Sequence, residues 1–228
     1  VIEGLKRLNI TEKYAIKVLL EEAGWNKEID EYTLGFIIGP LMNATGRLST
    51  AKLAIELLME EDMDRIRQLA KELVELNNTR KNLTQEGLDK CDKLVEDNSY
   101  DKSDVIVVYE PSIDESICGI VAGRIKEKYY RPTIVLTKSA EDGILKGSGR
   151  SIETYNMHKA ILPFEDKLES FGGHPMACGL SIKNVMVDDF RHFLNSQSKL
   201  TKNDLEEVIN IDTQIKISKL SLEFAEKL

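Results

Sequence analysis

Two short runs of consecutive apolar residues constrain the fold of this chain most strongly. They cover residues 105–109 and 133–137, and both are rich in β-branched side chains. Such runs are typical of strands buried on both faces of a sheet. Between them, residues 117–130 follow a helical pattern that Pro132 ends. Strands alternating with helices predict an α/β domain whose functional residues lie in loops beyond the strand ends.

The same alternation continues towards the carboxyl terminus. We expect further strands at residues 144–152 and 177–182, and further helices at residues 157–170 and 188–196. The composition then shifts after residue 200. Residues 207–217 alternate like a strand and residues 220–228 look like the start of a helix. This tail is therefore predicted to belong to another module.

The amino-terminal end is predicted to be helical. Residues 1–8 form a short amphipathic piece. A helix at residues 11–22 has Thr11 as a candidate N-cap and Gly24 as its stop.

The next segment contains a candidate anion ligand. Residues 31–38 form a short apolar stretch that Gly39 and Pro40 should halt, and residues 41–48 are too polar and glycine-marked for a helix interior. Arg47, beside a glycine and just before a helix start, could reach an anion. An ordinary loop arginine is the simpler interpretation of Arg47 alone.

A long helical pattern separates the two halves of the chain. After a short helix at residues 51–58, apolar residues recur at threes and fours from Ile66 to Val95. A polar patch at residues 77–82 interrupts this stripe, and no Gly or Pro occurs before Gly87. The pattern fits a connector between two domains or a helix of a bundle, and it does not decide between them.

Composition limits the possible partners and the cellular compartment. The net charge of −8 argues against a chain coated in basic surface for nucleic acid, but it leaves room for a local basic groove. Cys91, Cys118 and Cys178 lack zinc-site spacing and predict three reduced thiols in a cytoplasmic protein. There is no apolar run of about 18 residues and no signal peptide, so no membrane partner is expected. The start at Val1 without Met and the end in a helical pattern predict a piece of a longer protein.

Two small polar clusters about one helix apart form a candidate anion site. In residues 147–151, Ser148 and Arg150 are two residues apart and project from one face of a strand. A hydroxyl beside a guanidinium suits a phosphate or a carboxylate. The second cluster is a predicted turn, in which Gly172 and Gly173 let backbone N–H groups approach an anion and His174 adds a donor.

Ordinary structural roles remain open for these residues. A Ser-x-Arg pair is usually surface, a Gly-Gly pair is usually a turn, and a lone histidine is more often structural than catalytic. Tyr155, near the first cluster, could stack on a base. A packed tyrosine is the simpler interpretation of Tyr155.

Taken in order, four segments resemble the RecJ single-strand-specific exonucleases of the DHH phosphoesterase superfamily. The segments are Gly39-Pro40-x-x-Asn43-Ala44-x-Gly46-Arg47-Leu48, Gly119-Ile120-Val121-Ala122-Gly123-Arg124 followed by Arg131-Pro132, Gly147-Ser148-Gly149-Arg150-Ser151, and Phe171-Gly172-Gly173-His174-Pro175-x-Ala177-x-Gly179. No single motif decides the matter, but their order and spacing match across nearly the whole chain.

The resemblance implies a domain layout. Residues 1–48 would be the end of the catalytic DHH domain, residues 49–100 connector helices, residues 101–200 a DHH-associated α/β domain with a mixed sheet, and residues 201–228 the start of an oligonucleotide-binding domain. The two main domains of this family face each other across a cleft that admits single-stranded DNA.

The resemblance also implies roles for the candidate residues. Arg47, Ser148, Arg150, Gly172, Gly173 and His174 would bind the DNA end and its phosphates. His174 would be the catalytic candidate, since it could stabilise charge in the transition state.

The metal centre of this family is expected to lie outside this chain. The family uses Mn²⁺ or Mg²⁺ held by aspartates and histidines, including an Asp-His-His triplet that this sequence lacks. We therefore expect a metal-dependent 5'-to-3' exonuclease of DNA repair and recombination as the full protein, with this part inactive alone. Single-stranded DNA is the expected substrate, and a single-strand-binding protein or a helicase are candidate partners.

The sequence differs from the family pattern at two places, and three alternative functions remain open. Leu41 stands where relatives often carry a basic residue, so one backbone contact could be missing. Residues 111–116 replace a His-x-Gly type of turn, and there Asp114 and Glu115 could cap the next helix. The rivals are a phosphodiesterase of the same superfamily acting on short oligonucleotides or cyclic dinucleotides, a non-catalytic DNA-binding relative, and a nucleic-acid module like that of alanyl-tRNA synthetase.

Overall fold

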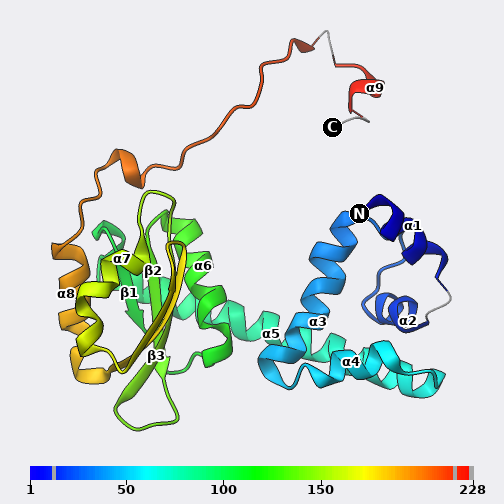
Figure 1. Ribbon diagram of the computed structural model, residues 1–228, viewed down its shortest axis with the longest axis horizontal. Helices are drawn as coiled ribbons and strands as arrows, with labels where there is room; N and C mark the ends of the chain where they lie inside the picture. The colour runs from blue at the N-terminus through cyan, green and yellow to red at the C-terminus, as the bar shows by residue number, and fades with distance from the viewer. Residues whose placement is uncertain (12–13, 218–219, 226–228) are drawn as a thin grey trace.

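The chain has a helical end and a sheet-containing end, joined by one long helix (Figure 1). The computed structural model describes residues 1–11, 14–217 and 220–225. The helical end is built from α1 (Ile2–Ile10), α2 (Tyr14–Glu22), a π-helix (Thr33–Ile38), α3 (Gly39–Leu48) and α4 (Lys52–Met59). The predicted helices at residues 11–22 and 51–58 are therefore present. Thr11 is the C-cap of α1, and the start of the predicted second helix falls on residues 12–13, outside the described residues.

The segment before Arg47 differs from the prediction. Residues 41–48 are helical rather than a loop, and Gly39 and Pro40 do not halt the preceding segment. The reason is the π-helical turn, in which the Gly39 N–H donates to the Leu34 carbonyl five residues back. This wider turn accommodates a proline that lacks an N–H and would distort a regular helix. Leu41 is buried in the helical end, so this position faces the core rather than a ligand.

The long helix α5 (Met63–Asp97) has 35 residues and contributes to two separate cores. Its first half packs Ile66, Leu69 and Leu73 against α2, α3 and α4. Its second half packs Cys91 and Val95 against β1 and α6. The first half of α5 is thus a helix of a bundle, and its second half belongs to the core of the sheet-containing end. The polar patch at residues 77–82 lies between the two apolar stretches.

The sheet has five strands in the order β1-β2-β3-β5-β4. The strands are β1 (Ile106–Tyr109), β2 (Thr133–Lys138), β3 (Ile144–Arg150), β4 (Ser170–His174) and β5 (Ala177–Lys183). Only β1 and β2 are parallel, joined through α6 (Cys118–Tyr129), and the other pairs are antiparallel. The predicted α/β class and mixed sheet are confirmed.

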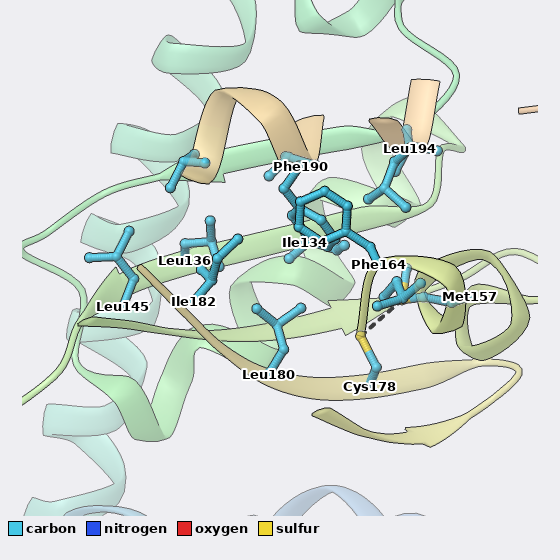
Figure 2. Packing of buried hydrophobic residues seen from close by; sticks show 14 of the residues in the cluster. Ile134, Leu136, Leu145, Met157, Phe164, Cys178, Leu180, Ile182, Phe190 and Leu194 are labelled. Atoms are coloured by element: carbon cyan, nitrogen blue, oxygen red, sulfur yellow. Dashed lines mark hydrogen bonds between the residues drawn. The ribbon is translucent and has the colours of Figure 1, made fainter. Parts of the chain in front are cut away.

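Helices cover the two faces of the sheet unequally. On one face α6 packs Val121 and Ile125 against Val135 and its neighbours on β1. On the other face α7 (Met157–Ile161) and α8 (Val187–Ser196) cover the strands, and Phe190 packs near Ile134 and Leu180 (Figure 2). The face that α6 occupies therefore stays open where the sheet extends beyond that helix, over β5 and β4.

The predicted helix at residues 157–170 is much shorter in the structure. The α-helix ends at Ile161, and a 3₁₀-helix (Leu162–Lys167) with Pro163 at its start follows. Proline cannot donate the hydrogen bond that would continue an α-helix. Ser170 already belongs to β4, so Gly172 and Gly173 lie in a strand and not in a turn. The turn that reverses the chain is at residues 175–176.

The carboxyl-terminal tail is not a strand. Residues 207–216 have no regular secondary structure, and Figure 1 shows the tail extending away from the sheet. Apolar and polar residues do alternate there in the sequence. However, Val208, Ile209 and Ile211 are exposed and meet no neighbouring strand in the described part of the chain. A short helix, α9 (Leu222–Ala225), falls within the predicted helical stretch, whose residues 226–228 are outside the described ones. Other 3₁₀-helices are Tyr100–Lys102, Glu115–Ile117, Asn184–Met186 and Asn203–Leu205.

Candidate functional site

Ser148 and Arg150 form a preassembled pair on β3. Arg150 Nη1 donates to Ser148 Oγ at 3.0 Å and to the Gly149 carbonyl at 2.8 Å. These bonds fix the guanidinium and leave its Nε and Nη2 groups without a partner among the described residues. Ser148 Oγ accepts from Arg150, so its own proton is available to a ligand. The prediction that the two side chains share one face is confirmed.

The strand register places both predicted clusters on one side of the sheet. Residues directly opposite each other on neighbouring strands project from the same face. Three rows run across β3, β5 and β4 on this face: Lys146, Ser181 and Ser170; Ser148, Gly179 and Gly172; Arg150, Ala177 and His174. We call these nine residues the open face. Most of them are small, so little side-chain bulk covers the backbone of β5.

The two clusters are nevertheless separated by one strand. Because β5 lies between β3 and β4, Arg150 and His174 are two strand spacings apart, roughly 10 Å. They are thus placed to contact different groups of one ligand. His174 is exposed at the end of β4, the edge strand.

Gly172 and Gly173 do not have equivalent positions. Gly172 belongs to the open face, and a Cβ there would meet nothing within 4 Å. Gly173 pairs with Cys178, whose side chain is in the core beneath the sheet, so it faces the other way. Its φ of +151° and a carbonyl oxygen of Ala177 only 2.4 Å from an ideal Cβ exclude other residues. Gly173 therefore shapes the strand.

The first turn of α6 closes one side of the open face. An ideal Cβ on Gly119 would lie 2.6 Å from Arg150 Nη2 and 2.9 Å from Ser148 Oγ. Only glycine lets the helix approach this pair so closely. The 3₁₀-helix just before this turn (Glu115–Ile117) is held from the helical end, since Arg47 Nη1 donates to the Ser116 carbonyl at 2.8 Å. Arg47 is exposed and is thus brought near the site from a different core.

A pocket of about 300 Å³ lies between this turn and the open face. Its lining includes Cys118, Ser148, Ser170, Gly179 and Ser181. At its edge Lys146 Nζ contacts Glu115 Oε1 at 2.8 Å. Glu115 therefore pairs with Lys146, while Asp114 performs the predicted capping by accepting from the Ser116 N–H at 2.8 Å. Both carboxylates are exposed, so the ion pair is open to exchange with another anion.

Tyr155 does not reach the site. Its side chain is buried in the core between the sheet and α7, and its hydroxyl has no hydrogen-bond partner among the described residues. Burial raises the pKa of this phenol. Base stacking by Tyr155 is therefore wrong, and the simpler interpretation of a packed tyrosine is confirmed.

Metal ligands do not gather in the described part of the chain. No group of three or more His, Cys, Asp and Glu residues there could hold an ion. His158 stacks on Phe171 with ring centroids 5.2 Å apart, whereas His192 is on α8. The residues present thus do not fit a divalent-metal centre. Among the described helices, none has the length and apolar character to cross a membrane.

Comparisons with known proteins show which family this chain is similar to. A family model described as the DHHA1 domain matches residues 102–203. The chain is 36% identical over 223 residues to the single-stranded-DNA-specific exonuclease RecJ of Bacillus subtilis, a match that covers 96% of this chain and 28% of that protein. It is 37% identical over 202 residues to RecJ of Escherichia coli, covering 84% of this chain and 34% of that protein. The chain belongs to the RecJ family.

Solved RecJ structures have the same fold. RecJ of Thermus thermophilus in complex with Mg²⁺ superposes with a TM-score of 0.72 at 28% identity, covering 85% of this chain and 30% of the other. Exonuclease RecJ bound to manganese superposes with a TM-score of 0.73 at 28% identity, covering 85% and 47%. The chain spans 28% of the length of the Bacillus subtilis RecJ protein and 41% of that of Haemophilus influenzae RecJ.

Several residues of the site were missed by reasoning from the sequence. Ser170, Gly179 and Ser181 build the open face, and Lys146 and Glu115 form its edge. A signal for the first three exists, because small residues recur at every second position of residues 177–181 and 170–172. The pairing of Lys146 with Glu115 has no such signal, since the two residues are 31 positions apart.

Proposed function

We propose that this chain is the part of a metal-dependent single-stranded-DNA exonuclease that holds the DNA end, while the metal ligands lie in another part of the protein. The observation that carries the proposal is the Ser148–Arg150 pair, which is fixed on a face of the sheet where the neighbouring positions of β5 and β4 are mostly glycine, alanine and serine. The Bacillus and Escherichia proteins named as single-stranded-DNA-specific exonucleases support the substrate class. The RecJ structures solved with Mg²⁺ or Mn²⁺ support the metal.

The proposed contacts follow from the chemistry of these groups. The terminal 5'-phosphate accepts from Arg150 Nε and Nη2 and from the Ser148 hydroxyl. Arg150 is prealigned by its bonds to Ser148 and Gly149, so little side-chain freedom is lost on binding. The small residues of β5 let the strand lie close to the sheet.

His174 is proposed to act on the neighbouring phosphate. Its separation from Arg150 by β5 suits the next phosphodiester of the same strand. There it donates a hydrogen bond to a phosphate oxygen and stabilises the charge that develops during hydrolysis. Arg47 adds positive charge at the first turn of α6. This arrangement gives 5'-to-3' polarity, because the free 5' end is anchored first.

The wider context is proposed from the same family membership. Residues 1–48 are the end of a DHH domain, residues 49–100 the connector, residues 101–200 the DHH-associated domain, and residues 201–228 the entry to an oligonucleotide-binding domain. The protein acts on single-stranded DNA in the cytoplasm during repair and recombination. A single-strand-binding protein or a helicase would supply the strand.

Fluorescence anisotropy with matched oligonucleotides tests the proposal. The chain should bind a 5'-phosphorylated single strand about tenfold more tightly than its 5'-hydroxyl counterpart at low salt. Arg150→Ala should abolish this preference, whereas Arg67→Ala should keep it, since Arg67 is exposed on α5 with only a 3.8 Å contact to Asp64. Equal affinity for the two ends in the unmodified chain would refute end binding here.

A second assay separates end binding from hydrolysis. The purified chain incubated with Mn²⁺ and a labelled single strand should release no nucleotides. Release that depends on Mn²⁺ would show that this part contains a metal centre after all. Tight binding of dinucleotides, with no gain from longer strands, would favour the rival function of a short-oligonucleotide phosphodiesterase.

A further inference from the structure

A second pocket with a cationic lining lies between the middle of α5 and α6. Its volume is about 350 Å³, and it is lined by Arg80, Lys81, Thr84, Gln85, Leu88, Ile120 and Arg124. We call it the basic pocket. Three of its lining residues are cationic and none is acidic, although the chain as a whole has a net charge of −8. The charge of the basic pocket is thus opposite in sign to the net charge of the chain.

Arg80 is held ready for a ligand. Its Nε donates to Asn77 Oδ1 at 3.2 Å, and Asn77 is itself buried. In the described part of the chain, neither Nη group has a partner and no carboxylate pairs with Arg80. Burial, and then the charge of Arg47, lower the pKa of Arg80. Two neighbouring guanidinium groups without a counter-charge repel each other, so an anion placed between them would be stabilising.

The other two cations can turn towards the same anion. Lys81 is exposed and has no ion pair among the described residues. Arg124 approaches Glu127 only at 3.8 Å, with both side chains more than half exposed, and such a pair is weak. The hydroxyl of Thr84 already donates to the Arg80 carbonyl at 2.7 Å. Gln85 Nε2 likewise donates to Asp89 Oδ1 at 2.8 Å. The side-chain donors that remain for a ligand are therefore the three cations, and Leu88 and Ile120 give the pocket an apolar wall.

The basic pocket is adjacent to the end-binding site. Consecutive residues of α6 contribute to each, since Gly119 approaches Ser148 and Arg150 while Ile120 lines the basic pocket. Arg47 lies beside the same turn through its bond to the Ser116 carbonyl. A strand held by its end at Arg150 can thus continue past Arg47 around the first turn of α6.

We infer that the basic pocket binds an internal phosphate of the same single strand, with the apolar wall against the attached sugar. The inference rests on the proposed function, because it takes the strand to be anchored at Ser148 and Arg150. The group that binds is a phosphodiester, and inorganic phosphate presents the same kind of anionic oxygens. Strand length distinguishes these two sources.

The test compares strand lengths in matched variants. A 5'-phosphorylated dinucleotide, a 5'-phosphorylated 12-mer and inorganic phosphate are each titrated into the unmodified chain, Arg80→Gln, Arg124→Gln, Arg150→Ala and the control Arg67→Gln. Arg80→Gln and Arg124→Gln should weaken the 12-mer about tenfold and leave the dinucleotide unchanged. Each should also make the salt dependence of 12-mer binding shallower by about 0.7 in log–log slope. Arg67→Gln should change neither, and Arg124, being exposed, tests the inference even if Arg80→Gln lowers stability.

The outcomes separate the two proposals. If Arg150→Ala weakens both ligands while Arg80→Gln and Arg124→Gln change neither, end binding stands and the basic pocket is not on the strand path. If Arg80→Gln weakens the dinucleotide as much as the 12-mer, Arg80 belongs to the end site and the inference fails. If Arg80→Gln reduces only the binding of inorganic phosphate, the pocket is a free-anion site and the inference also fails. If Arg150→Ala has no effect on either ligand, the proposed function itself is wrong.

Discussion

At the scale of single residues, Gly119 decides whether the phosphate-binding pair can form. Its missing side chain leaves space for Arg150 Nη2 and Ser148 Oγ. The sequence could show that Gly119 is part of a family segment, but not which atoms it approaches. That contact joins a helix to a strand 29 or more positions away, and local patterns carry no information about such pairs.

We predict that Gly119→Ala separates binding from stability. Alanine is the better helix former, but Gly119 is in the first turn of α6 and its new methyl group meets only the ends of two side chains, so the temperature of thermal unfolding should change little. The new methyl group should displace Arg150 and reduce the preference for a 5'-phosphate about tenfold. Gly123→Ala is the matched control, because Gly123 is on the same helix and a Cβ there meets nothing within 4 Å. Identical binding by the two variants would contradict this role of Gly119.

The buried thiols predict a pH dependence of stability. Burial, and then the nearby Glu110 carboxylate, raise the pKa of Cys91 from 9.0 to about 12. Burial, and then Glu115, do the same for Cys118. A group whose pKa is raised on folding stabilises the fold fully below its unfolded pKa, and this contribution is lost as the pH rises towards the folded value. The free energy of unfolding should therefore decline above about pH 9.

Urea unfolding at pH 7, 9 and 10.5 measures this decline. Cys91→Ala should be less stable at pH 7 but should lose stability less steeply with rising pH, since it lacks one titrating thiol. Parallel curves for the two proteins would show that Cys91 does not contribute to the alkaline loss.

Among the secondary-structure elements, continuous apolar runs predicted strands correctly, whereas glycines predicted turns and helix ends that the structure does not have. β1 and β2 are buried on both faces, so their residues alone identify them. β4 contains Gly172 and Gly173 and is mostly exposed, and its strand character comes from pairing with β5. Likewise, α3 continues through Pro40 because the preceding π-helical turn absorbs the disturbance. Tertiary context overrode the local rule in both cases.

The dual role of α5 leads to a stability prediction. Leu73 is fully buried where α5 meets α2 and α3, so Leu73→Ala should cost about 2–5 kcal/mol in the free energy of unfolding. Ile55→Ala on α4 is the control, since Ile55 is 60% exposed and should change stability by less than about 0.5 kcal/mol. Urea unfolding at pH 7 compares them. Equal losses would mean that the helical end is not packed as described.

At the scale of the whole molecule, the sites combine contributions from both cores. Arg47 comes from the helical end, Arg80 from the middle of α5, and Arg150 from the sheet. The net charge of −8 hides this local concentration of positive charge. The family segments indicated Arg47, Ser148 and Arg150 in advance. They could not indicate Arg80 or Arg124 as neighbours, because only the folded path of α5 beside α6 brings these two together.

An NMR titration locates the ligand on the protein directly. The backbone amide signals of the ¹⁵N-labelled chain are followed by NMR while a 5'-phosphorylated single strand is added. The open face and the first turn of α6 should respond, with the largest shifts in β3, in β5 and at residues 116–120. The helix α8 on the opposite face should stay unchanged. Shifts concentrated instead around the pocket of about 410 Å³ lined by Lys159, Phe193 and Lys199 would contradict the account and place the nucleic acid on the other side of the sheet.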